Sequence, residues 1–185
     1  MQNRNGSPLG ASAERNVVVG RARIGQGLFA KRAFRAGQTI IQIRGRVVHW
    51  KLLWEIGGDF QANCIRFGPE TYLDPSASPG RWINHSCEPN AAIGKVNNQL
   101  FLFAAAPIRA GAEITFDYST TIGDDDVWTM RCKCGGAACR KRIRNFGALT
   151  PALRESYVER GMVPTFILAT LEPGLVATRA RTPRR

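Results

Sequence analysis

Hydrophobic segments between residues 17 and 116 predict a chain built mainly of short β-strands. The first two are VVVGRARI from Val17 and QTIIQIR from Gln38 to Arg44, separated by a turn at residues 35–37. Further strands are expected at residues 63–67, 71–73, 91–96, 100–104 and 112–116. The Asn97-Asn98 pair predicts a hairpin turn, because asparagine adopts positive φ at little cost. We therefore expect one mainly β domain with short strands and long connections.

Two helices are expected from the sequence. The pattern is weak around His49 to Glu55 and clear after Thr150, where Pro151 occupies the first helical position and Gly161 follows the end. Apolar residues recur in this second segment every four positions, which predicts a stripe that packs onto a sheet: Leu149, Leu153 and Tyr157.

Length and composition are those of a globular protein. The chain has 185 residues, of which 44% are hydrophobic, enough for one compact domain with tails. No apolar run approaches the roughly 20 residues that span a bilayer, and residues 1–16 contain no hydrophobic stretch of a secretory signal. We expect a cytoplasmic protein with no membrane partner. A nucleoid-associated location, or a nuclear one in a eukaryote, is compatible with this expectation.

The charge is unevenly distributed along the chain. The net charge is +12, with basic ends and a mildly acidic middle that includes Asp124, Asp125 and Asp126. A uniformly basic surface would favour nucleic acid as the main ligand. This distribution favours a basic polypeptide docking on the middle region, although the three aspartates are equally compatible with a solvated acidic loop. The Arg-rich ends leave a weak nucleic-acid contact open.

Three of the five cysteines form a C-x-C-x4-C cluster, CKCGGAAC, made of Cys132, Cys134 and Cys139. In a reducing compartment this spacing favours a metal site over disulfides. Zinc at a structural site takes four ligands, so either Cys87 or Cys64 is expected to complete the set. The alternative is three unpaired thiols in a loop.

The segment from Ile24 to Ala30 superficially fits the dinucleotide-binding pattern G-x-G-x-x-G/A. That pattern needs a long helix and an acidic residue further on, whereas Gly37 interrupts this chain within ten residues. The dinucleotide interpretation is therefore rejected. A plain turn between two strands, or a turn that lets the backbone approach a ligand, remains.

Four motifs in order give the chain a family resemblance. GQGLFAKRAF is followed by RWINHSCEPNA, AGAEITFDY and CKCGGAAC, and this order resembles the SET-domain family of protein lysine methyltransferases. The resemblance implies a mainly β, β-clip-like fold of small curved sheets around a pseudoknot, with a short C-terminal helix. It divides the chain into a disordered N-terminal tail (1–15), a SET domain (16–120), a zinc-binding post-SET segment (121–145), a C-terminal helical extension (146–176) and a basic tail (177–185).

The resemblance also implies ligands and site residues. The methyl donor would be S-adenosylmethionine, and one structural zinc ion would be bound by Cys87, Cys132, Cys134 and Cys139. The cofactor would be contacted by the loop Ile24, Gly25, Gln26, Gly27 and Leu28, and by Arg81, Asn84, His85 and Trp128. Tyr118 matches the active-site tyrosine, and Phe116 matches the Phe/Tyr switch position that lines the lysine channel. For His85 the plainer alternative is a core histidine with satisfied hydrogen bonds.

One position departs from the family pattern. Many members carry Tyr-x-Gly where this chain has Ile43-Arg44-Gly45, so a hydroxyl beside the target nitrogen is missing. We expect S-adenosylmethionine-dependent methylation of lysine side chains in a basic protein, namely a histone, a histone-like or DNA-associated protein, or a ribosomal protein. The alternative is an inactive SET-like binding module that contacts nucleic acid or protein through its Arg-rich ends.

Overall fold

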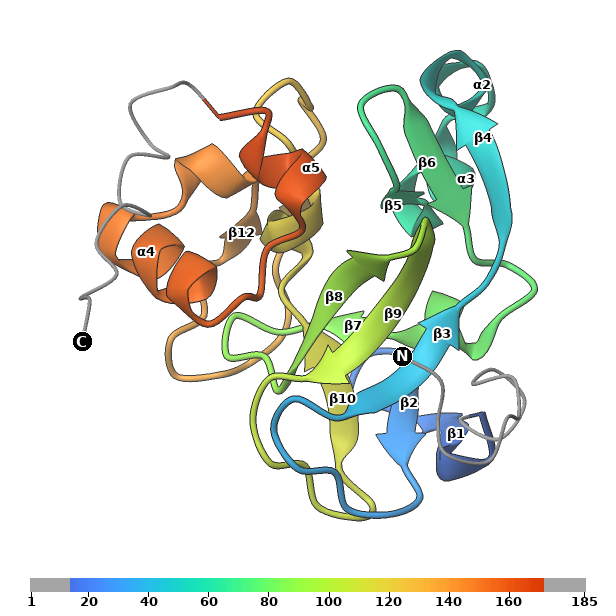
Figure 1. Cartoon of the computed structure of the whole chain (residues 1–185), viewed down its shortest axis with the longest axis vertical. Coiled ribbons are helices and arrows are strands. Elements are labelled where there is room, and N and C mark those ends of the chain that lie inside the picture. Colours follow the sequence, from blue (N-terminus) through green and yellow to red (C-terminus); the bar gives the residue numbers. More distant parts are fainter. Residues whose placement is uncertain (1–13, 172–185) are drawn as a thin grey trace.

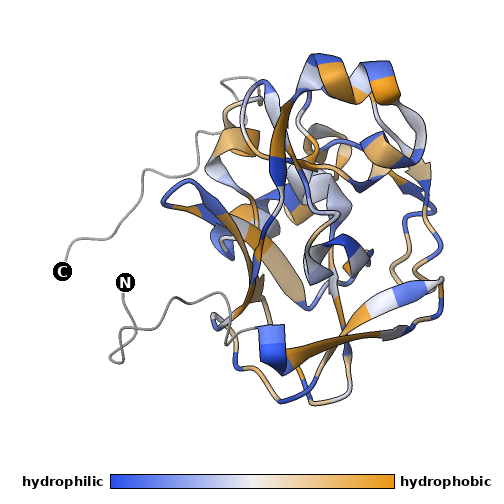
Figure 2. Ribbon diagram, turned by 90° about the vertical axis from the view of Figure 1, so that its right-hand side faces the viewer, coloured by the Kyte–Doolittle hydropathy of each residue, from blue (hydrophilic) through white to orange (hydrophobic). Residues whose placement is uncertain are grey.

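The computed structural model describes residues 14–171 and contains four small β-sheets with short helices between them (Figure 1). Figure 2 shows hydrophobic residues concentrated along the strands and a mixture of hydrophobic and hydrophilic residues on the helices. The mainly β class predicted from the sequence is confirmed. Most of the expected N-terminal tail and all of the expected basic tail lie outside the described residues.

The first sheet joins segments that are far apart in the sequence. Its strands, in spatial order, are β1 (Val17–Arg21), β2 (Gln26–Ala30), β10 (Glu113–Phe116) and β7 (Asn84–His85). β7 and β10 are parallel and the other pairs are antiparallel. This order brings the GQG, Asn-His and ITFDY motifs into one sheet. The threading of a C-terminal segment under a loop stays a prediction.

Two three-stranded sheets complete the main β structure. One has the order β3 (Thr39–Ile43), β9 (Gln99–Ala104), β8 (Ala91–Val96), and the other has the order β4 (Arg46–His49), β6 (Thr71–Asp74), β5 (Ile65–Arg66). Asn97 and Asn98 connect β8 to β9 with φ values of 48° and 58°, which confirms the predicted hairpin turn.

The helices are short. α2 (Trp50–Ile56) and α3 (Gly58–Asn63) lie between β4 and β5, whereas α4 (Pro151–Glu159) and α5 (Thr165–Leu168) follow a two-stranded sheet of β11 (Met130–Arg131) and β12 (Arg142–Ile143). Both predicted helices are confirmed as α2 and α4. No helix within residues 14–171 is long and apolar enough to cross a membrane.

Three hydrophobic clusters hold these elements together. The largest unites the first three sheets, and a second packs Leu149 and Tyr157 against α5 and Ala92 of β8. The predicted stripe therefore faces the protein interior, with Leu153 partly buried at its margin, but Leu149 precedes α4 and is not part of the helix. A third cluster surrounds Cys87 and Cys132 and includes Ile122 and Ile143.

Several elements were not predicted from the sequence. β2 occupies residues that the sequence analysis assigned to a loop, and β4, β7, β11, β12, α3 and α5 were not expected. Gly25, at φ 63°, forms the tight turn between β1 and β2. The plain strand-to-strand turn, one of the two alternatives for this segment, therefore describes its backbone correctly.

Candidate functional site

The first sheet places the glycine loop directly beside the Asn-His motif. The Asn84 amide nitrogen donates to the Gln26 carbonyl at 2.9 Å and to the Glu113 carboxylate at 2.7 Å. Gly27 makes this possible, because a Cβ there would lie 2.8 Å from the Ala22 Cβ and 3.1 Å from the Asn84 nitrogen. Neither hydrogen bond uses the Asn84 Oδ1, which leaves an acceptor for a ligand next to the loop.

Tyr118 follows β10 and closes one end of a narrow cavity of about 70 Å³. Its hydroxyl donates to the Ile83 carbonyl at 2.8 Å, and its ring centroid lies 4.8 Å from that of Phe116. Burial and the nearby Glu113 carboxylate raise the pKa of Tyr118, so the phenol is neutral at physiological pH. The structure thus brings the two residues assigned to the lysine channel together at one cavity.

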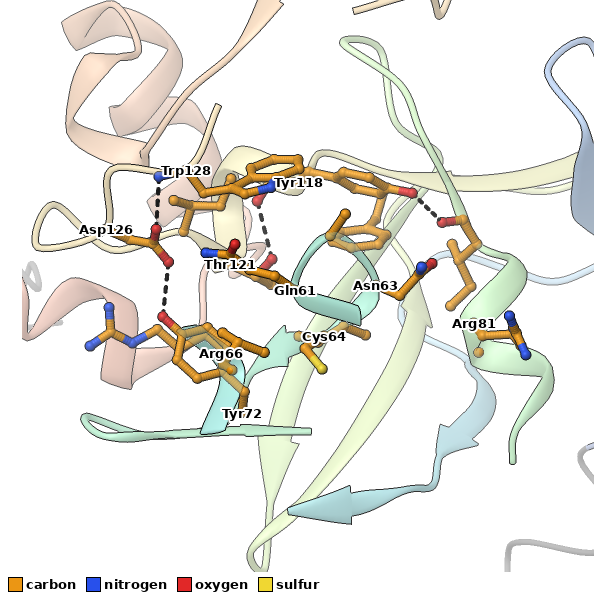
Figure 3. A pocket seen from close by; sticks show the side chains of 17 residues that line it. Gln61, Asn63, Cys64, Arg66, Tyr72, Arg81, Tyr118, Thr121, Asp126 and Trp128 are labelled. Atoms are coloured by element: carbon orange, nitrogen blue, oxygen red, sulfur yellow. Dashed lines mark hydrogen bonds between the residues drawn. The ribbon is translucent and has the colours of Figure 1, made fainter. Parts of the chain in front are cut away.

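The walls of this cavity come from distant parts of the chain, and the segment 80–83 with Arg81 adds to the two walls described next (Figure 3). One wall consists of α3 and the strands β5 and β6, with Gln61, Asn63, Cys64 and Tyr72, and the other is the segment from Tyr118 to Trp128. Burial raises the pKa of the Cys64 thiol to about 12, so Cys64 is a neutral wall residue. Leu53, Ile65 and Ile122 make much of the remaining lining apolar.

The residues assigned to the cofactor are not all on this cavity. Arg81 and Trp128 line it together with Tyr118, whereas Ile24 lines a separate depression beside the cysteine cluster. Gln26, Gly27 and Leu28 belong to β2, next to Asn84. Ile43 is buried in the main hydrophobic cluster and is not among the cavity residues.

Both ring nitrogens of His85 contact other groups of the protein. Its Nδ1 accepts a hydrogen bond from the Tyr118 backbone N–H at 3.2 Å, and its Nε2 lies 3.3 Å from the Cys87 sulfur. Burial lowers the pKa of His85 to about 4, so the ring is neutral and its 3.5 Å approach to Asp117 is not an ion pair. His85 therefore connects the cysteine cluster to Tyr118, and contact with a cofactor would use its backbone.

Asp117 is a buried residue of the site that the sequence analysis did not single out. Its carboxylate accepts hydrogen bonds from Arg140 at 2.7 Å, from the Tyr157 hydroxyl at 3.0 Å and from the Ser119 backbone at 3.0 Å. These contacts tie the cysteine segment and α4 to the residue before Tyr118. The only available signal was its place in the ITFDY motif, because partners 23 and 40 residues away leave no local pattern.

The cysteines converge as a candidate metal site. The Cys132 sulfur lies 3.7 Å from that of Cys87 and 3.6 Å from that of Cys139. A tetrahedral site with Zn–S bonds of about 2.3 Å places its sulfurs about 3.8 Å apart, so these distances fit such an ion. Cys64 lies on the cavity instead.

One further donor lies beside the cysteines. The ligand atoms of His85, Cys87, Cys132 and Cys134 all lie within 4.8 Å of one another. His85 is therefore a neighbouring alternative to Cys139, although the other nitrogen of its ring is bound to Tyr118.

Two side chains hold the cysteine loop against the rest of the site. Arg23, in the turn before Ile24, donates to the Cys134 carbonyl at 3.0 Å, and Glu88 accepts from the Ala138 backbone at 3.2 Å. The Arg23 guanidinium occupies the space that a Cβ at Gly135 would fill. Gly135 is thus required by this contact and by its φ of 74°.

Each carboxylate of the acidic run has a hydrogen-bond partner within the protein. Asp125 pairs with the buried Arg66, and Asp126 accepts from the Tyr72 hydroxyl and the Trp128 backbone, both at 2.9 Å. The third member, Asp124, accepts from the Gly147 backbone at 2.8 Å. Asp125 and Asp126 therefore fix Arg66 and Tyr72 of the cavity wall, whereas Asp124 holds the backbone at Gly147, so the run is more than a solvated loop. The docking of a basic polypeptide on this region stays a prediction.

Comparison with known proteins gives a consistent result. A model of the SET domain matches residues 25–119. The H3 lysine-4 specific histone-lysine N-methyltransferase of Mycosarcoma maydis is 32% identical over 127 residues, which is 62% of this chain and 9% of that protein. The putative histone-lysine N-methyltransferase ASHH4 of Arabidopsis thaliana is 26% identical over 178 residues, which is 89% of this chain and 49% of that protein. The chain thus spans less than half the length of these relatives.

Solved structures agree with the sequence matches. The crystal structure of KRYPTONITE in complex with mCHH DNA, H3(1-15) peptide and SAH superposes with a TM-score of 0.55 at 26% identity, covering 69% of this chain and 29% of that one. The matched family model covers the glycine loop, the Asn-His motif and Tyr118, which the first sheet and the cavity bring together. This chain belongs to the SET-domain family.

Proposed function

We propose that this chain transfers methyl groups from S-adenosylmethionine to the side-chain amine of lysine in a basic protein. The observation that carries the proposal is the position of the Tyr118 hydroxyl, 2.8 Å from the Ile83 carbonyl at the end of a narrow cavity beside Phe116. Behind it lies the sheet that holds Asn84 and the glycine loop. A lysine side chain from one side and a methyl donor from the other would meet at this hydroxyl.

The reaction requires a neutral amine, and the cavity favours one. Free lysine has a pKa of about 10.4, so deprotonation at pH 7 costs roughly 4.6 kcal/mol. Apolar walls such as Phe116 and Ile65 disfavour the ammonium, and the positive charge of the donor sulfonium disfavours it further. The amine then attacks the methyl carbon while the carbon–sulfur bond breaks and its electron pair remains on sulfur. The proton that the new ammonium releases passes to water.

The residues of this chain supply alignment rather than a proton acceptor. The Tyr118 hydroxyl donates to the Ile83 carbonyl and so keeps its lone pairs as acceptors, and the adjacent Phe116 ring would restrict the rotation of the amine. The free Oδ1 of Asn84 suits the amino group of the donor. Bound S-adenosylmethionine supplies the activated methyl group.

The cysteine cluster fits one zinc ion with a structural role. Cys87, Cys132, Cys134 and Cys139 would hold it, and backbone N–H groups of Cys134 and Arg140 lie 3.4 Å from the sulfurs of Cys132 and Cys87. A metal there would anchor a segment whose own hydrophobic contacts are few. Through His85 and Arg140 it would also support the position of Tyr118.

The substrate class is supported by the relatives. Those reported above are named histone-lysine methyltransferases, and the KRYPTONITE complex contains an H3(1-15) peptide and SAH. We extend this to a basic, flexible segment of a histone or of another DNA-associated or ribosomal protein. The division into a SET domain, a post-SET segment and a helical extension is proposed with the boundaries given above.

The proposal is tested by incubating the full chain with a labelled methyl donor and a panel of lysine peptides. Mass spectrometry should find label on lysine with the parent chain and a large loss with Tyr118→Phe. If the parent transfers no label to any basic protein while binding nucleic acid, the inactive binding module is the better description.

A further inference from the structure

The cysteine segment is strongly basic. Residues 127–154 contain seven Arg or Lys residues and no Asp or Glu. Five of these side chains are exposed and form what we call the cationic face: Arg131, Lys133, Lys141, Arg142 and Arg144. No acidic residue lies between them in the sequence, and Glu88 contacts the same loop at Ala138. The five positive charges outnumber this carboxylate, so they add over one part of the surface.

The backbone holds some of these charges close together at a cost. Arg131 on β11 lies directly opposite Arg142 on β12, and like charges at such a position destabilise the strand pair. Lys141, the residue before β12, has a φ of 65°, which is uncommon for a residue with a side chain. A surface selected only for stability would carry neither feature.

The cationic face also borders a concave surface. Arg131, Lys133 and Lys141 line a depression of about 670 Å³ beside the cysteine loop, and Arg23 joins them from the turn before β2. Arg23 donates to the Cys134 carbonyl and forms no ion pair with any residue of the described range 14–171. Four cations from three segments therefore surround one hollow.

The buried Arg66 and the half-buried Arg140 are neutralised by carboxylate partners. Arg66 pairs with Asp125, and Arg140, although it lies within the same segment, pairs with Asp117. Within residues 14–171 none of the five residues of the cationic face forms an ion pair. Apart from the cysteine sulfurs that line the same depression, no anionic side chain of the described residues pairs with them there, so part of their charge is available to an external anion.

We infer that the cationic face binds the phosphate backbone of duplex DNA. A basic substrate would be repelled from the cationic face. The cationic face must therefore bind an acidic partner, whereas the lysine cavity receives a basic one. A basic protein already bound to DNA offers both, and this last step rests on the proposed function. Binding through phosphates alone carries little sequence preference and is strongly dependent on salt.

The test uses the full chain and a labelled duplex of about 20 base pairs, with fluorescence anisotropy between about 50 and 200 mM salt. The variant combines Arg131→Gln, Lys141→Gln and Arg142→Gln. The control removes the same charge elsewhere with Lys31→Gln, Arg35→Gln and Arg109→Gln. The control positions lie on two loops joined by the Phe34–Ile108 bridge, at the bottom of Figure 1 and far from β12. Metal content and the thermal midpoint confirm that each protein is folded.

Each lost phosphate contact reduces the slope of log K against log salt by about 0.9. The cationic-face variant should therefore lose about 2.7 from the slope and about 500-fold in affinity near 0.1 M salt. The control should stay close to the parent. Equal losses in both variants would mean that net charge, rather than this face, attracts DNA.

Three further outcomes would overturn the inference. They are no DNA binding by the parent, an unchanged cationic-face variant, and equally effective displacement of DNA by polyglutamate, which would indicate an acidic protein partner. No methyl donor or peptide is present in the assay, so its result is independent of whether methyl transfer occurs.

Discussion

The hydrogen bond between Tyr157 and Asp117 gives a quantitative test of how α4 supports the site. The Tyr157 hydroxyl donates to the buried Asp117 carboxylate at 3.0 Å, and the side chain of Asp117 has no exposed surface. A hydrogen bond to a charged group contributes about 1.5–3 kcal/mol. Tyr157→Phe keeps the buried ring and removes this donor, so we expect a loss of about 2 kcal/mol of unfolding free energy.

For a domain of this size the change corresponds to a fall of roughly 4–8 °C in the thermal midpoint. Urea unfolding followed by circular dichroism measures it, with the m-value unchanged. Tyr72→Phe is the matched control, because its hydroxyl donates to Asp126 at 2.9 Å at a partly exposed site where water replaces the donor. It should cost about 0.5–1 kcal/mol. Equal losses in the two variants would refute the argument that burial of Asp117 makes its contact stronger.

The remaining predictions concern the reaction and the metal. Tyr118→Phe should lower turnover sharply with little change in the dissociation constant of S-adenosylhomocysteine; undiminished turnover would remove Tyr118 from the mechanism. Phe116→Tyr should shift the products toward monomethyl-lysine in mass spectra, because an added hydroxyl restricts the amine, and identical product ratios would count against a switch at this position. Chelation or Cys134→Ser should raise hydrogen exchange in the cysteine segment and lower activity, whereas a fully active metal-free protein would contradict the structural role of the metal. Because burial and Glu113 raise the pKa of Tyr118, turnover should rise with pH up to about 9 as the lysine amine loses its proton; a fall above neutral pH would mean that Tyr118 ionises.

Local patterns in the sequence predicted much of the β structure. Residues 91–96 were identified from their hydrophobicity and from the Asn97-Asn98 turn, and β8 has those bounds. Thr150 and Pro151 likewise marked the start of α4. The hydrophobic pattern, the turn residues and the helix start all lie within a few residues of the element they mark, so each element can be predicted from its own segment.

Other features depend on residues far away in the chain. β7 is only two residues long and exists because it pairs with β10, about 30 residues later. The hydrogen bonds of Asp125 and Asp126 were not predicted because their partners, Arg66 and Tyr72, come from strands more than 50 residues earlier in the chain. The family resemblance identified Tyr118 and Phe116 as site residues although no local pattern marks them. It did not indicate the hydrogen bonds of Asp117 or the contact of Arg23 with the cysteine loop.

The central claim is that donor and lysine meet at the Tyr118 hydroxyl, and a crystal structure of the chain with S-adenosylhomocysteine and a lysine peptide tests it most directly. We predict that the lysine nitrogen lies about 3 Å from this hydroxyl, reached through the cavity beside Phe116, with the donor sulfur beyond it on the Asn84 side. A peptide lysine outside the cavity, or a donor analogue bound away from Asn84 and Tyr118, would contradict the account.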